Sequence, residues 1–84
     1  MENKLKEWAE QYLHIIAKYD GGRGYTWSMA AHELDELYNE ITVNMRYHGI
    51  RAGWKHVLAD ALRNDKIRPE RDRVRELAKK EAEA

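Results

Sequence analysis

Histidine and acidic side chains are the residues of this chain that could bind a metal ion or move a proton. The segment His32-Glu33-Leu34-Asp35-Glu36 begins like the zinc-peptidase helix motif His-Glu-x-x-His. That motif needs a second histidine four residues after the first, because two imidazoles on one helix face hold the zinc. Glu36 stands at that position instead. We therefore interpret His32 and Glu36 as an exposed helix-surface pair, and we predict no metal and no cofactor.

Nucleophiles and phosphate-binding loops are equally poorly represented. The chain has no cysteine, and Ser28 is its single serine, so no catalytic triad can be argued from the sequence. The glycine-rich segment 21–24 lacks both the preceding strand and the Gly-Lys-Ser/Thr ending of a P-loop. We interpret it as a turn between helices that leaves Arg23 and Tyr25 exposed to a partner. The sequence thus favours a protein that is not an enzyme.

Composition indicates one small domain. The chain has 84 residues, with 15 basic and 15 acidic side chains, so no overall field attracts nucleic acid or a membrane. It has no phenylalanine, and its three Trp and five Tyr all carry a polar group that needs a partner when buried. Because neither a signal peptide nor a long apolar run is present, we expect a cytoplasmic protein.

Apolar residues recur at helical spacing in three segments, which predicts helices at about 3–19, 27–48 and 51–64. Thr26 or Ser28 should cap the second helix, and Gly53 should move the start of the third toward Trp54. We expect a connection at 64–68 and a fourth helix that starts at Pro69, where the missing N–H costs nothing. Short connections make neighbouring helices antiparallel.

These elements predict an all-α fold, a small three- or four-helix bundle with a charged C-terminal helix. The bundle core should span residues 1–68. Residues 69–84 should form the charged helix, packed loosely or projecting, with a frayed end.

The second helix has apolar residues on two sides, which is the first feature that points to a partner. Opposite the core stripe, Met29, Val43 and Tyr47 fall within about 40° of one another, with glutamates between them. Three interpretations remain open: packing against the fourth helix, contact with another chain, and no special role. The candidate partner-binding residues are Met29, Glu36, Glu40, Val43 and Tyr47.

A basic stripe on the C-terminal helix is the second feature. Regularly spaced positive side chains are what phosphate contacts require, although acidic neighbours dilute the charge. A solvated, salt-bridged helix, an acidic protein partner and nucleic acid all remain open. The candidate anion-binding residues are Arg23, Arg68, Arg71, Arg75 and Lys79.

The leading hypothesis is a non-enzymatic protein-interaction module, either homodimeric or docking on a larger protein as an adaptor or inhibitor. The alternative is a nucleic-acid-binding accessory protein that uses the basic helix. No family is recognised. Cysteine-free chains of this length are frequent among phage and mobile-element products, an association with size only.

Overall fold

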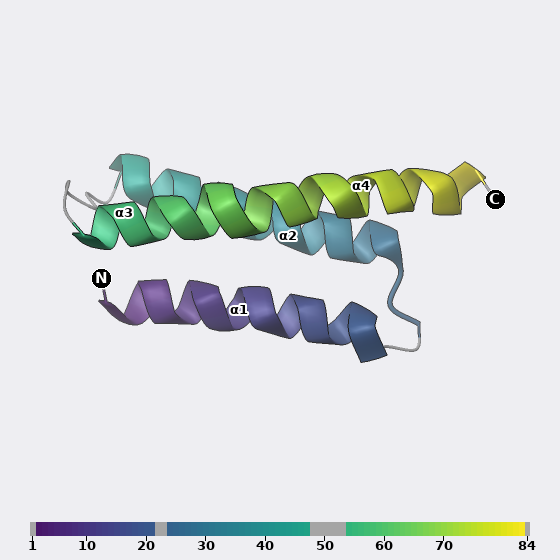
Figure 1. Cartoon of the computed structure of the whole chain (residues 1–84), viewed down its shortest axis with the longest axis horizontal. Helices are drawn as coiled ribbons and strands as arrows, with labels where there is room; N and C mark the ends of the chain where they lie inside the picture. The colour runs from purple at the N-terminus through teal and green to yellow at the C-terminus, as the bar shows by residue number, and fades with distance from the viewer. Residues whose placement is uncertain (1, 22–23, 48–53, 84) are drawn as a thin grey trace.

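Three helical rods lie side by side and form an elongated bundle. The computed structural model describes residues 2–21, 24–47 and 54–83. Its elements are α1 (Glu2–Gly21), α2 (Trp27–Tyr47), α3 (Trp54–Ala61), the π-helical segment η1 (Leu62–Ile67) and α4 (Arg68–Glu83). In Figure 1, α3 continues through η1 into α4 as one rod, and α2 runs antiparallel to both α1 and this rod. The bundle measures 45 × 20 × 18 Å. The predicted all-α bundle with a charged C-terminal helix is confirmed, with three rods.

The core is a seam of apolar residues spaced alternately three and four apart. On α2 this seam is Ala30, Leu34, Leu37 and Ile41, all of which are buried. This spacing places side chains on one face of a helix, so a single stripe of α2 meets both neighbouring rods. Trp8 and Ile15 are the buried residues of α1. The stripes that periodicity predicts on α1 and α2 contain these buried residues. On α3 the apolar side predicted from periodicity is wrong for Val57 and Leu58, which are exposed, whereas Ala59 is buried.

The N-terminus of α2 is capped from two directions. The Oγ1 of Thr26 accepts a hydrogen bond from the Met29 N–H at 3.1 Å, which confirms Thr26 as the cap. The Trp27 N–H donates to the Glu81 carboxylate at 3.2 Å. Gly24 precedes the cap with a φ of 78°, a conformation that glycine adopts without steric cost. The far end of α4 is therefore attached to the start of α2.

The predicted connection at 64–68 is wrong, because this segment lies within the third rod. These residues are helical, and the chain passes from α3 to α4 without a break. Within η1 the Arg68 N–H donates to the carbonyl of Arg63, five residues earlier rather than four. Pro69 follows directly, and its ring would clash with the carbonyl four residues back in a regular α-helix. The wider π-helical turn accommodates the proline inside the rod, so Pro69 does not start a separate helix.

Helix α4 packs firmly on α2, in contrast to the loose packing that its composition predicts. Ile67 and Val74 are completely buried. The guanidinium groups of Arg71 and Arg75 both reach the Asp35 carboxylate on α2, at 3.4 and 2.8 Å. The predicted boundary after residue 68 thus falls inside a continuous rod. A charged helix is held here by a few buried apolar side chains and by two ion pairs that share the Asp35 carboxylate.

None of the helices in the described ranges is long and apolar enough to cross a membrane.

Candidate interaction surface

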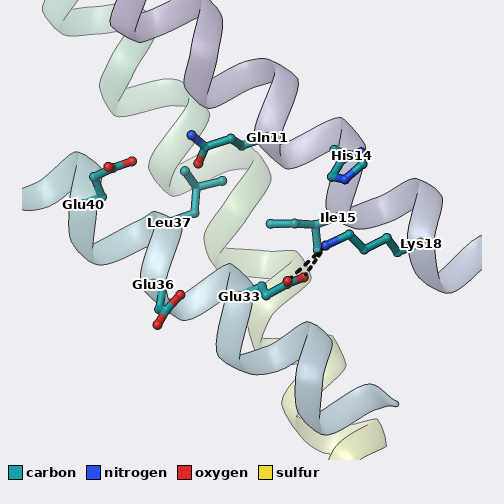
Figure 2. A pocket seen from close by; sticks show the side chains of 8 residues that line it. All are labelled: Gln11, His14, Ile15, Lys18, Glu33, Glu36, Leu37 and Glu40. Atoms are coloured by element: carbon teal, nitrogen blue, oxygen red, sulfur yellow. Dashed lines mark hydrogen bonds and ion pairs between the residues drawn. The ribbon is translucent and has the colours of Figure 1, made fainter. Parts of the chain in front are cut away.

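A groove lies between α1 and α2, with α4 behind it (Figure 2). Its volume is about 300 Å³. The buried side chains of Ile15 and Leu37 belong to the core and form its floor. The residues that line the groove are Gln11, His14, Ile15 and Lys18 of α1, and Glu33, Glu36, Leu37 and Glu40 of α2.

Helical periodicity explains why both walls are polar. Gln11, His14 and Lys18 are spaced three and four residues apart, and Glu33, Glu36 and Glu40 follow the same pattern. Each row therefore lies along one helix face, beside the apolar seam. On α2 the glutamates were expected on this second face. On α1 no role was predicted for the polar row, so its part in the groove was missed.

Glu33 sits at one end of the groove in a network of three polar groups. Its two carboxylate oxygens lie 3.0 and 3.3 Å from the Lys18 Nζ, and the Tyr25 hydroxyl also donates to it. Burial works to raise the pKa of Glu33, but the hydrogen bonds from Tyr25 and Lys18 outweigh it and lower the pKa below 4.5. The Lys18 ammonium also lies 5.4 Å from the centre of the Tyr25 ring.

Tyr25 was expected to be exposed and available, and that expectation is wrong. The side chain is half-buried, and its hydroxyl is used by Glu33. Burial, followed by the hydrogen bond to Glu33, raises the pKa of Tyr25. Tyr25 therefore helps to hold Glu33 in place beside the groove. Arg23, which was proposed beside it, lies outside the described residues.

Glu36 and Glu40 differ in how far they are already engaged. The Glu40 carboxylate accepts a hydrogen bond from the Trp8 indole N–H at 3.0 Å. Glu36 lies 2.9 Å from the His32 Nε2, and its side chain is 68% exposed. This confirms the interpretation of His32 and Glu36 as a helix-surface pair. Glu36 is thus the more accessible of the two carboxylates to a partner.

Met29 and Val43 lie on α2 on the same face as the groove glutamates. They are 49% and 46% exposed, although both are large and apolar. Packing of this face against the fourth helix was one open interpretation. It is wrong for Met29 and Val43, because α4 packs on the flank of α2 that carries Asp35 and Tyr38. The side chain of Tyr47 lies outside the described part of the chain.

The residues of the basic stripe on α4 fall into two groups, those paired with α2 and those exposed. Arg71 is only 13% exposed, since its guanidinium pairs with Asp35 and lies 4.5 Å from the centre of the Tyr38 ring. Arg75 pairs with the same carboxylate. Arg68 and Lys79 are exposed. The structure therefore brings Arg71 and Arg75 together, but on an acidic residue of α2.

Within the described ranges, no group of three or more His, Asp or Glu side chains is arranged to hold a metal ion. The chain matches no protein-family model, no curated protein and no solved structure.

Proposed function

We propose that this chain is a non-enzymatic protein-interaction module that binds its partner through α2 and the groove beside it. The observation that carries the proposal is the exposure of Met29 and Val43 on a face that no described helix covers. Large apolar side chains exposed along one helix face are typical of protein-binding surfaces. The partner is either a second copy of the chain or another protein, for which this chain acts as an adaptor or inhibitor.

The spacing of the two apolar residues supports a long contact. Met29 and Val43 are fourteen positions apart, which places them about 21 Å from each other along α2. Glu36 lies midway between them. A partner that touches both apolar residues must also cover the glutamates between them. The whole length of the α2 face would then be used, rather than one small site.

The polar groups of the groove support binding rather than catalysis. Glu33 and Glu40 already accept hydrogen bonds from Lys18, Tyr25 and Trp8, and the contacts of Lys18 and Trp8 hold α1 on α2. Groups engaged in this way are suited to shaping a rigid surface. A cysteine-free chain also suits a reducing compartment, so we propose a cytoplasmic location.

The test compares wild type with the double variant Met29→Glu, Val43→Glu. Light scattering at several concentrations and two salt levels measures the solution mass. Val57→Glu serves as the matched control, because Val57 is 63% exposed on α3 rather than on α2. If wild type is a dimer, the double variant should be a monomer with an unchanged helical circular-dichroism signal. If wild type is a monomer, immobilised wild type and Val57→Glu should retain a protein from cell extract that the double variant does not.

Two results would contradict the proposal. Association that survives in the double variant would show that this face is not the docking surface. A double variant that loses its helical signal, while Val57→Glu keeps it, would show that Met29 and Val43 support the fold itself.

A further inference from the structure

We infer that the groove between α1 and α2 receives a cationic amphipathic helix of a partner protein, which packs there as the fourth helix of the bundle. This inference rests on the proposed function and specifies the chemistry of the partner.

The spacing of the groove walls suits a helix. On α2, Met29, Glu33, Glu36, Glu40 and Val43 are separated alternately by four and three residues. On α1, Glu7, Gln11, His14 and Lys18 have the same spacing. This is the repeat with which helices pack side by side, since each side chain inserts between those of the neighbour. The groove lies between the two rows and is lined on α2 from Glu33 to Glu40, while Met29 and Val43 continue the α2 row beyond it. A helix that packs along both rows would complete a four-helix arrangement.

The charge of the groove determines which side chains the partner helix should have at its central positions. The groove and its α1 rim present one ammonium group, that of Lys18, against five carboxylates: Glu7, Glu10, Glu33, Glu36 and Glu40. Lys18 is paired with Glu33, and Glu36 has only His32 beside it. Glu7 is paired with Lys4, and Glu40 has the Trp8 indole N–H. An apolar or acidic helix would bury Glu36 and Glu40 with no cation of the chain's lysines or arginines beside them among the described residues, which is costly. Lysine or arginine at the central positions would pair with them and would fix the register.

Beyond the groove, the two ends of the α2 row favour apolar side chains on the partner helix. Met29 stands near one end of α2 and Val43 near the other, and both are apolar and half-exposed. A docking helix gains most there by placing leucine, isoleucine or methionine against them. The expected partner helix is therefore apolar at both ends of its contact stripe and basic in the middle.

The occupant is a different protein rather than a second copy of this chain. The basic helix of this chain is α4, and its Arg71 and Arg75 are committed to Asp35 within the same molecule. The buried Val74 and Ile67 on the same rod hold it against α2. Releasing α4 to fill the groove of another copy would break these contacts.

The experiment selects helices against the full chain from a displayed library. Each library member is an amphipathic helix of about 20 residues, long enough to span about 30 Å, with random residues at the positions of its contact stripe. Parallel selections use wild type, Glu36→Lys and the matched control Glu76→Lys. Glu76 is exposed on α4, so this control makes the same change in net charge outside the groove.

Selection on wild type and on Glu76→Lys should enrich lysine and arginine at the central positions and apolar residues at the ends. Selection on Glu36→Lys should lose the central basic preference. Binding of a selected helix should weaken about tenfold or more in Glu36→Lys and should fall with added salt.

Three outcomes would overturn the inference: no enriched helix, a stripe without basic preference, or equal weakening by Glu36→Lys and Glu76→Lys. If helices without basic residues still require Met29 and Val43, the docking surface stands and only the cationic helix fails. If the selected basic helices bind the Met29→Glu, Val43→Glu variant as tightly as wild type, the apolar ends of the α2 row are not used and the proposed function fails.

Discussion

The indole N–H of Trp8 donates a hydrogen bond to the Glu40 carboxylate at 3.0 Å, which joins the core of α1 to the wall of the groove. Trp8 is buried to 1% exposure, whereas Glu40 faces solvent. A buried indole without an acceptor is costly, so Glu40 satisfies a donor that the core cannot satisfy itself. A residue predicted as a partner contact therefore also stabilises the pairing of α1 with α2.

We expect Glu40→Ala to lower the free energy of unfolding by about 1–3 kcal/mol, because the Trp8 N–H loses its acceptor. Glu40→Gln should cost less, since the amide oxygen can accept the same bond. Urea unfolding followed by circular dichroism measures both. Glu36→Ala is the control, as Glu36 pairs only with the exposed His32. If Glu36→Ala and Glu40→Ala were equally destabilising, the hydrogen bond would not be the cause.

Asp35 is the residue through which α4 is tied electrostatically to α2. It accepts from both Arg71 and Arg75, and Arg71 is largely shielded from water. Asp35→Ala should therefore destabilise the protein by about 1–3 kcal/mol, since a partly buried guanidinium loses its counter-charge. Asp72→Ala, which removes the more exposed partner of Arg71, should cost less. Chemical unfolding compares the two, and a larger effect of Asp72→Ala would contradict the assignment.

The nucleic-acid alternative is now testable without disturbing the fold. Arg71 supports the packing of α4, so a loss of binding after its replacement would be ambiguous. Arg68 and Lys79 are exposed members of the same stripe. If the stripe binds nucleic acid, Arg68→Gln with Lys79→Gln should weaken binding to all sequences and reduce its salt dependence. Fluorescence anisotropy with a labelled duplex measures this, and unchanged binding would exclude these two side chains as contacts.

Tyr19 should make the protein sensitive to alkali. Within the described residues its hydroxyl is buried without a hydrogen-bond partner, and its ring lies 5.2 Å from that of Trp27. Burial, followed by the charge of the nearby Glu70, raises the pKa of Tyr19 from 10.0 to about 12. The unfolded chain therefore loses this proton first. Stability is retained below about pH 10 and falls as the pH rises from there toward the folded pKa.

Tyr19→Phe removes this titration and keeps the ring. We expect the variant to be at least as stable as wild type at neutral pH, because it removes a buried hydroxyl that no hydrogen bond satisfies among the described residues. Between about pH 10 and 12 its free energy of unfolding should fall less steeply than that of wild type. Urea unfolding at a series of pH values measures the difference. Parallel curves for the two proteins would show that the Tyr19 hydroxyl ionises equally in both states.

Helix periodicity was sufficient to predict most of the architecture. The stripes of α1 and α2 and the Thr26 cap follow from local rules on spacing and capping, and both are found in the structure. Local rules also grouped Met29, Val43 and the glutamates on one face of α2. What they could not show is which neighbouring rod covers which flank, because that depends on side chains more than thirty positions apart, such as Asp35 and Arg75.

The prediction that a separate helix starts at Pro69 was wrong, for an identifiable reason. Proline is common at the first position of a helix, so a break before it is the usual interpretation. The structure instead keeps one continuous rod, on which Ala59 and Ile67 are both buried although they are eight residues apart. In a regular α-helix eight residues overshoot two turns by about 80°. One extra residue in a π-helical turn restores the shared face, and the same turn accommodates Pro69.

The additional residue of the π-helical segment η1 should therefore be removable. Deletion of the exposed Asp65 together with Pro69→Ala leaves Ala59 and Ile67 seven positions apart, the spacing of a regular helix packed in a bundle. The variant should unfold cooperatively, with helical content and stability no lower than those of wild type. Deletion of Asp65 alone should cost about 3 kcal/mol or more, because Pro69 would then interrupt a regular α-helix.

The matched control is deletion of the exposed Glu76, which lies in regular α-helix. That deletion rotates everything after it by about 100°, so the half-buried Leu77 moves to another face and Glu81 leaves the Trp27 N–H. It should destabilise the protein where the Asp65 deletion with Pro69→Ala does not. Circular dichroism and urea unfolding measure both variants. The Asp65 variant could also prove the less stable of the two. The π-helical segment would then do more than align Ala59 with Ile67 and accommodate Pro69, which would contradict the role assigned to it.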